Sequence, residues 1–185
     1  MALKTAFGGS PARPQPLVPS PGRRLLCAGA LGGWLVGLGG CASGLVFHSF
    51  SFDAIVESPG IAVLDYRYGA SQQPGARATE RDKNMKDIRQ GVNINGDMLR
   101  GDELYVKWRI NATQKVYEDT VNLKALLPRD IAHHRIHFTI QGQQLLVYLI
   151  TPERRPADWP IAGPRMYDYL KVLTLSSNFG REVAP

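Results

Sequence analysis

Apolar and polar residues alternate along residues 104–111, and this is the clearest structural signal in the chain. Every second position is large and apolar, including Leu104 and Trp108, while the positions between them are polar or charged. Neighbouring side chains of a β-strand point to opposite faces, so the alternation predicts a strand buried on one face. A turn at residues 111–114 precedes a second run at residues 115–123, and we expect the two strands to form an antiparallel hairpin.

The second strand of this hairpin has one irregular position. Asp119 falls on the apolar face, which is also the face of Tyr117 and Val121. Either a β-bulge or a place at the edge of the sheet would explain a carboxylate there.

Five further segments have strand-like patterns, namely residues 46–53, 61–68, 134–140, 145–150 and 167–175. The segment at residues 145–150 is apolar on both faces, which is typical of a central strand. In the segment before it, Ile136 and Phe138 should face inward, whereas His137 and Thr139 should face outward. About seven strands joined by turns, with no convincing amphipathic helix, predict an all-β fold, either an antiparallel β-sandwich or an open barrel.

Residues 69–98 contrast with these strands because they are polar and contain few large apolar side chains. We expect a long polar loop here, and a connection of this length is either functional or flexible. Within it, residues 82–90 could form one short helix, and Asn95-Gly96 is typical of a turn.

The N-terminal region has the composition of an export signal. Residues 25–40 carry no charge and directly follow Arg23 and Arg24, and small residues end the stretch. A basic flank, a short apolar stretch and small residues at its end are typical of a secretory signal. The stretch of 16 residues is shorter than the roughly 20 residues that a membrane-spanning helix needs.

The distribution of charge supports the same division of the chain. The formal net charge is +6, but four of the 22 basic residues precede Cys41 and all 16 acidic residues follow it. The chain after Cys41 therefore has 18 basic and 16 acidic groups, and these are interspersed. Because no dense basic stripe exists to replace phosphate counterions, we expect no nucleic-acid binding.

Leu38-Gly39-Gly40-Cys41 resembles the lipobox of bacterial lipoproteins, in which a branched apolar residue and two small residues precede a cysteine. The resemblance implies that the cysteine sulfur receives a diacylglyceryl group and that the chain is cut before Cys41. A plain signal anchor, or a glycine-rich helix with a chance cysteine, is the alternative. Ala42 stands where an aspartate would, by resemblance to enterobacterial sorting, favour the inner membrane, so we expect the outer membrane.

These features predict three segments. Residues 1–40 form a cleavable signal peptide, residues 41–45 a lipidated anchor, and residues 46–185 a β-domain that faces the periplasm. Cys27 lies in the segment that is removed. The mature domain then has no disulfide and no free thiol, and its hydrophobic core alone must hold it together.

The residues that usually carry chemistry do not form a recognisable site. On a strand, His133 and His137 would share one face and His134 the other, and no cysteine or nearby carboxylate completes a tetrahedral set. We interpret them as surface histidines and expect no metal. No nucleophile elbow, phosphate loop or dinucleotide fingerprint occurs, and no serine has a recognisable partner histidine. The sequence therefore favours a protein that is not an enzyme and has no cofactor.

Residue types that are common at binding hot spots remain as candidates for a contact surface. Tyr105, Lys107 and Arg109 fall on the outer face of the clearest strand. The other candidates are Tyr66 and Tyr68, before the long polar loop, and Trp159, in a proline-rich connection. Tyr, Trp and Arg are enriched where proteins bind one another, although each group alone is also compatible with an ordinary strand surface.

A second resemblance concerns residues 101–109, GDELYVKWR, and residues 116–121, VYEDTV. These segments are similar to small proteobacterial lipoproteins that are sometimes encoded beside type VI secretion lipase effectors. The resemblance implies a lipid-anchored periplasmic binding protein that acts by protein–protein contact, in its sharpest form an immunity-type inhibitor of an antibacterial lipase. The alternative is a structural envelope or secretion-assembly lipoprotein.

The expected anchor can be tested by one substitution. Cys41→Ser removes the sulfur that would carry the lipid, so the protein should leave the membrane fraction and should no longer incorporate radiolabelled palmitate. Persistent membrane association of the variant would instead favour an uncleaved signal anchor.

Overall fold

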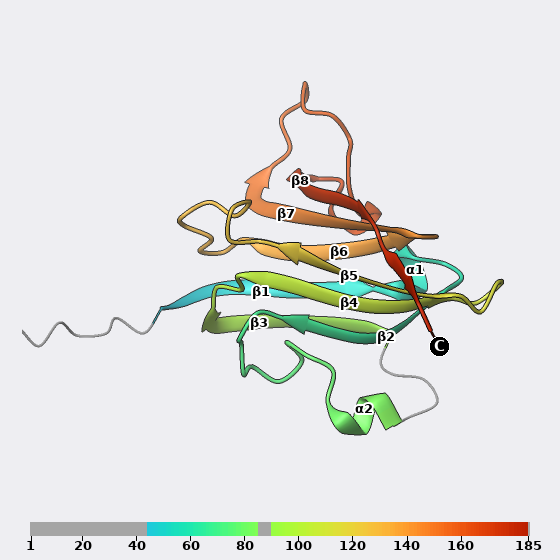
Figure 1. Cartoon of the computed structure of the whole chain (residues 1–185). Helices are drawn as coiled ribbons and strands as arrows, with labels where there is room; N and C mark the ends of the chain where they lie inside the picture. Colours follow the sequence, from blue (N-terminus) through green and yellow to red (C-terminus); the bar gives the residue numbers. More distant parts are fainter. Residues whose placement is uncertain (1–43, 85–89, 185) are drawn as a thin grey trace, which may run out of the picture. The chain divides into compact units, whose positions relative to one another are not determined.

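The computed structural model describes residues 44–84 and 90–184. These residues form two β-sheets that pack face to face around one core (Figure 1). The larger sheet contains, in spatial order, β3 (Gly91–Leu99), β1 (Leu45–Asp53), β6 (Arg135–Gln141), β7 (Gln144–Arg154) and β8 (Leu170–Phe179). The smaller sheet contains β2 (Ile61–Tyr68), β4 (Glu103–Ile110), β5 (Val116–Asn122) and β9 (Arg181–Val183). The fold is therefore all-β, and the two separate sheets make it a sandwich rather than an open barrel.

Helical structure is confined to three short segments in the part of the chain that the structure describes. These are α1 (Ala54–Glu57), α2 (Glu80–Asn84) and the 3₁₀ turn η1 (Arg165–Tyr167). The first helix begins where it does because Oδ1 of Asp53 accepts hydrogen bonds from the backbone N–H groups of Ile55 and Val56, both at 3.0 Å. None of the described helices is long and apolar enough to cross a membrane.

The strands are antiparallel to their neighbours with one exception. β1 and β6 run parallel, with Phe50 opposite Ile136 and Phe52 opposite Phe138. A hairpin forces two strands to be antiparallel, but β1 and β6 are far apart in the sequence, and the chain visits the other sheet between them. Nothing in the connection therefore dictates their relative direction.

The inner faces of the sheets contribute a core that is rich in aromatic rings. The rings of Phe50 and Tyr68, from opposite sheets, stack with centroids 5.0 Å apart and planes 8° apart. Phe52 stacks on Phe138 at 4.6 Å. The alternation of β4 is confirmed, because Leu104 and Trp108 are completely buried on its inner face.

Tyr66 and Tyr68 correct an expectation, because they are core residues and do not belong to an exposed surface. They are 4% and 0% exposed, since the register of β2 places them opposite the buried residues Val106 and Leu104 of β4. Nδ1–H of His48 donates to the carbonyl of Val46 at 2.7 Å, so its Nε2 accepts the hydroxyl proton of Tyr68 at 2.9 Å. Burial lowers the pKa of His48 and raises the pKa of Tyr68 to about 12, so both groups are neutral at pH 7.

The expected loop at residues 69–98 contains a complete strand, which is the main error of the sequence prediction. β3 lies at the edge of the larger sheet and pairs with β1 along its whole length. Because only one face of an edge strand meets the core, its outer positions are short polar residues, and its strand signal is weak. Gly96, expected in a turn, lies within this strand opposite His48. The helix expected at residues 82–90 begins earlier, at Glu80, and residues 85–89 lie outside the described part of the chain.

The irregular position of β5 is explained by the edge of the sheet rather than by a bulge. The register of β4 and β5 is continuous, with Asp119 opposite Val106. β9 pairs only with residues 116–118 of β5, so the strand becomes an edge from Asp119 onward. Nδ2 of Asn178 donates to the carboxylate of Asp119 at 3.1 Å. With three residues, β9 is too short to give an alternating pattern.

β7 lies between β6 and β8 and is apolar on both faces, as predicted. Its outer face forms a second small cluster, in which Tyr148 and Ile150 pack with Val172 and Tyr167. The connection between β7 and β8 therefore covers part of this face, which explains why His137 and Thr139 are buried instead of exposed. His133 precedes β6 and has a φ of 61°, so the expected sharing of a strand face with His137 does not hold.

Gly180 connects β8 to β9 and so carries the chain from one sheet to the other. A Cβ atom at this position would lie 2.3 Å from Cη2 of Trp108 and 3.2 Å from Cβ of Tyr117. Trp108 cannot easily move, because it is fully buried and its Nε1–H donates to the carbonyl of Gly142 at 3.0 Å.

Gly180→Ala should therefore lower the free energy of unfolding by about 1–3 kcal/mol, measured by urea denaturation. Gly44→Ala is the matched control, because a Cβ there meets no atom within 4 Å. Equal effects of the two substitutions would contradict this packing.

Candidate binding surface

The outer face of the smaller sheet carries three of the predicted contact residues. Tyr105, Lys107 and Arg109 project from β4, the strand between β2 and β5. All three are partly exposed. We call them, together with Arg67 of β2, the outer β4 face.

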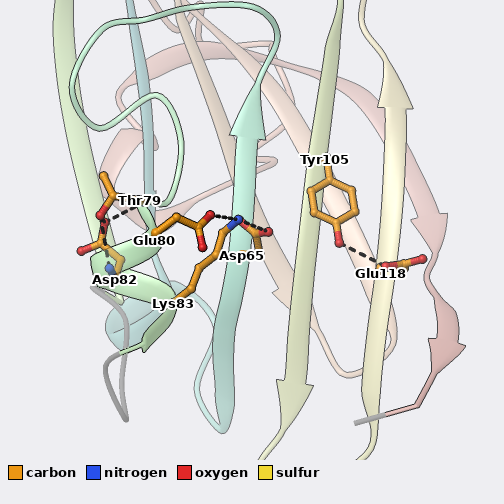
Figure 2. Close-up of polar contacts among 7 residues, drawn as sticks. All are labelled: Asp65, Thr79, Glu80, Asp82, Lys83, Tyr105 and Glu118. Carbon is orange, nitrogen blue, oxygen red and sulfur yellow. Dashed lines mark hydrogen bonds and ion pairs between the residues drawn. The ribbon is translucent and has the colours of Figure 1, made fainter.

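Tyr105 is held in place by both neighbouring strands, and Figure 2 shows its contact with Glu118. Its hydroxyl donates to Oε2 of Glu118 on β5 at 3.1 Å. The guanidinium of Arg67, on β2, lies 5.7 Å from the centre of its ring. Burial, followed by the hydrogen bond to the Glu118 carboxylate, raises the pKa of Tyr105 to about 12. The phenol therefore stays neutral and fixed in orientation at pH 7.

Most of the other charges around Tyr105 are paired. Arg67 donates to Oε1 of Glu103 at 2.8 Å. Glu118 accepts hydrogen bonds from Arg181 and Tyr105, in that order of effect, and they lower the pKa of its carboxyl. Lys83 of α2 forms ion pairs with Asp65 and Glu80, both at 3.2 Å, as Figure 2 shows.

The start of α2 is fixed beside this face by its own cap. Oδ2 of Asp82 accepts hydrogen bonds from the backbone N–H of Thr79 at 2.9 Å and from its hydroxyl at 2.6 Å. The hydroxyl oxygen of Thr79 in turn accepts from the backbone N–H of Asp82 at 3.2 Å. This reciprocal arrangement satisfies donors at the first turn of the helix and positions Lys83 near Asp65 (Figure 2).

Lys107 and Arg109 differ from these residues because neither has a hydrogen-bond or ion-pair partner among residues 44–84 and 90–184. Lys107 lies between Asp65 and Glu118 in the register, but both carboxylates are bonded to other cations. Nε of Arg109 is buried without a hydrogen-bond partner. Two cationic side chains therefore retain donors that the described part of the protein does not use.

A pocket of about 630 Å³ adjoins the same face. It lies where β2, β4 and β5 meet the loops that follow or precede them, and it shares Arg67 with the outer β4 face. Its remaining lining residues are Gly69, Ala70, Gln72, Arg77, Asp102, Glu103, Thr120, Asn122 and Lys124. Charged residues of both signs are present in this lining, together with Gly69 and Ala70.

The predicted contact residues are thus only partly brought together. Tyr105, Lys107 and Arg109 share one face, as expected. Trp159 lies on the larger sheet, where its Nε1–H donates to the carbonyl of Val172 at 3.2 Å. The outer faces of a sandwich point away from each other, so Trp159 does not extend the outer β4 face. Tyr66 and Tyr68 are in the core.

The sequence prediction missed the acidic and polar neighbours of these cations. Glu103 and Thr120 line the pocket, and Glu118 orients Tyr105. The alternation of β5 contained the signal, because Glu118 and Thr120 occupy the positions between its buried residues, but only the cross-strand register reveals their partners.

Elsewhere in the described segments the structure pairs a serine with a histidine, contrary to expectation. Oγ of Ser51 and Nδ1 of His137 are 2.8 Å apart on the larger sheet. No three His, Cys, Asp or Glu side chains within those segments are grouped so that they could hold a metal ion. Cys41 lies outside the described residues.

Comparisons of this chain with models of protein families, with curated proteins and with solved structures find no match.

The ion pair between Arg181 and Glu118 allows a test of the contacts around Tyr105. Because Arg181 is the larger cause of the lowered pKa of Glu118, Arg181→Gln should raise that pKa towards its ordinary value. Tyr105→Phe should raise it by a smaller amount. Carboxyl carbon NMR across an acid titration measures both shifts, and a larger effect of Tyr105→Phe would contradict the observed contacts.

Proposed function

We propose that this chain is a binding protein that contacts a protein partner through the outer β4 face and the adjoining pocket. The observation that carries the proposal is a pair of cations, Lys107 and Arg109, to which residues 44–84 and 90–184 supply no hydrogen-bond or ion-pair partner, beside an aromatic ring that is already held in place. Tyr105 loses little conformational freedom when a partner binds, because Glu118 and Arg67 fix its orientation. An oriented tyrosine beside an arginine has the composition of a binding hot spot.

The pocket gives the surface beside the outer β4 face a concave part that a partner can enter. Its volume of about 630 Å³ is sufficient for one or two side chains of a partner loop, and its lining presents donors and acceptors of both charge signs. The partner that fits is a polar protein surface with exposed carboxylates opposite Lys107 and Arg109. Charges that are complementary across an interface contribute more to the specificity of binding than to its affinity.

The proposal also covers the cellular setting. A lipid on Cys41 would hold the domain at the outer membrane, facing the periplasm, and tethering would raise its concentration near a membrane-active partner. In that setting the protein is an immunity-type inhibitor of a secreted antibacterial lipase effector. This specific role rests on the resemblance of residues 101–109 and 116–121 to lipoproteins encoded near such effectors. A structural envelope or secretion-assembly lipoprotein is the second candidate, because that role requires the lipid anchor but no particular contact surface.

Competition between cells tests the proposal. Cells that lack the gene should die when exposed to siblings that carry the effector, and the wild-type gene should restore survival. Lys107→Glu combined with Arg109→Glu should weaken partner binding at least about tenfold and reduce survival, because the reversed charges repel the partner's carboxylates.

The matched control reverses two arginines on the side of the larger sheet, Arg154 in β7 and Arg165 in η1. Arg154→Glu with Arg165→Glu changes the net charge equally and should leave survival intact. Equal loss of survival in both double variants would contradict the outer β4 face as the contact surface. Unchanged survival of cells without the gene would contradict the immunity role and favour the envelope role.

A further inference from the structure

The larger sheet has its own cavity, which lies apart from the outer β4 face. Its volume is about 310 Å³, at the lower end of the range for small-molecule sites. β1 and β6 provide Ser51 and His137, β3 provides Val92, and η1 provides Met166 and Tyr167. Phe52, Asp53, Gly91 and Asn93 complete the lining.

His137 is the unusual member of this lining. Its side chain is 1% exposed, and its ring meets the ring of Tyr167 edge to face at 5.3 Å. Nδ1 has a partner in the hydroxyl of Ser51 at 2.8 Å, but Nε2 is buried and has none in the described structure. Buried polar atoms are nearly always hydrogen-bonded, so an orphaned nitrogen at a cavity wall indicates a ligand atom.

The contact with Ser51 determines whether Nε2 of His137 is a hydrogen-bond donor or acceptor. The hydroxyl of Ser51 has no other hydrogen-bond partner in the described structure. We therefore assign its O–H as the donor and Nδ1 of His137 as the acceptor. In a neutral imidazole the remaining proton is then on Nε2. The cavity therefore presents an N–H donor, which requires an oxygen or nitrogen acceptor.

The charges near the ring favour an electron-rich acceptor. Burial, followed by the charge of Arg135, lowers the pKa of the His137 imidazole to about 3. The guanidinium of Arg135 donates to Oδ1 of Asn93 at 2.6 Å and lies 5.5 Å from the centre of the Tyr167 ring. Asp53 also lines the cavity, and its Oδ1 accepts two hydrogen bonds from the first turn of α1.

The same groups argue against nucleophilic catalysis by Ser51. An imidazole with so low a pKa is a weak general base at pH 7. No carboxylate within the described residues bonds to the ring to orient it, as a catalytic triad would require. The pair is therefore suited to binding rather than to bond cleavage.

We propose that this cavity binds a small ligand through a carboxylate or carbonyl oxygen that accepts a hydrogen bond from Nε2–H of His137, while Met166 and Tyr167 contact its apolar part. The carboxylate and the carbonyl share the same planar oxygen acceptor. The site is independent of the proposed protein contact, because it lies on the other sheet.

Two isosteric probes test the site on the full chain in detergent. Acetate and acetamide are each titrated at pH 7 against protein with ¹⁵N-labelled histidine, and the imidazole nitrogens are followed by NMR. Probes of this size bind no tighter than roughly tens of micromolar, so the titration extends to on the order of 100 mM. Methylammonium, which has no acceptor, is the control probe.

We expect Nε2 of His137 to shift and saturate with at least one of the two acceptors and not with methylammonium. Saturation by acetate alone assigns a carboxylate, and saturation by acetamide alone assigns a neutral carbonyl. His134 is an internal control, because it does not line the cavity and its ring bonds to the carbonyl of Ala132 at 2.8 Å. Its signals should not saturate with either probe.

Asn93→Trp should weaken binding at least tenfold, because Asn93 lines the cavity from the edge strand, on the same face as Ser51, and a Trp side chain there would fill the space. His137→Phe keeps the ring shape but removes the reporting nitrogens, so binding to this variant is followed by line broadening of the methyl signal of the probe, which the substitution should abolish. Urea denaturation checks that both variants fold. Three results would each overturn the proposal: no saturable shift with either acceptor, an equal shift with methylammonium, or unchanged binding in the folded Asn93→Trp variant.

Discussion

The structure depends on the burial of two aromatic-rich sheet faces against each other. Phe50 and Tyr68 stack across the interface at 5.0 Å, and Trp108 is completely buried. Residues 44–84 and 90–184 contain no cysteine and so no disulfide, which makes apolar burial their main stabilising term. The side chains on the inner faces are buried in the core. The residues that can contact a partner or a ligand therefore lie on the outer faces and at the ends of the strands.

The two outer faces differ in how they are covered. On the smaller sheet, β4 exposes Tyr105, Lys107 and Arg109, and within the described part of the chain the two cations have no hydrogen-bond or ion-pair partner. On the larger sheet, the connection between β7 and β8 covers a second apolar cluster and leaves a cavity beside His137. A charged face suits contact with another protein, whereas a small cavity with a buried imidazole nitrogen in its wall suits a small molecule. The two proposals therefore involve separate parts of the fold.

The sequence predicted the strands in which the same face, or both faces, are buried along the whole length. β4 alternates cleanly because one face meets the core, and β7 is apolar throughout because both faces are buried. β3 was missed because an edge strand needs few apolar residues. The burial of Tyr66, Tyr68 and His137 depends on register and on a distant covering segment, and local periodicity contains neither. The cations of the outer β4 face were predicted, but their carboxylate neighbours required the pairing of β4 with β5.

Site-specific photo-crosslinking in living cells tests the proposed contact surface most directly, because it captures a partner whatever its identity. A photo-reactive phenylalanine derivative in place of Tyr105 probes the outer β4 face, and the same derivative in place of Thr174 probes the exposed face of β8. We expect one discrete crosslinked protein from position 105 and none from position 174. A crosslink from position 174 with none from position 105 would contradict the outer β4 face as the site of contact.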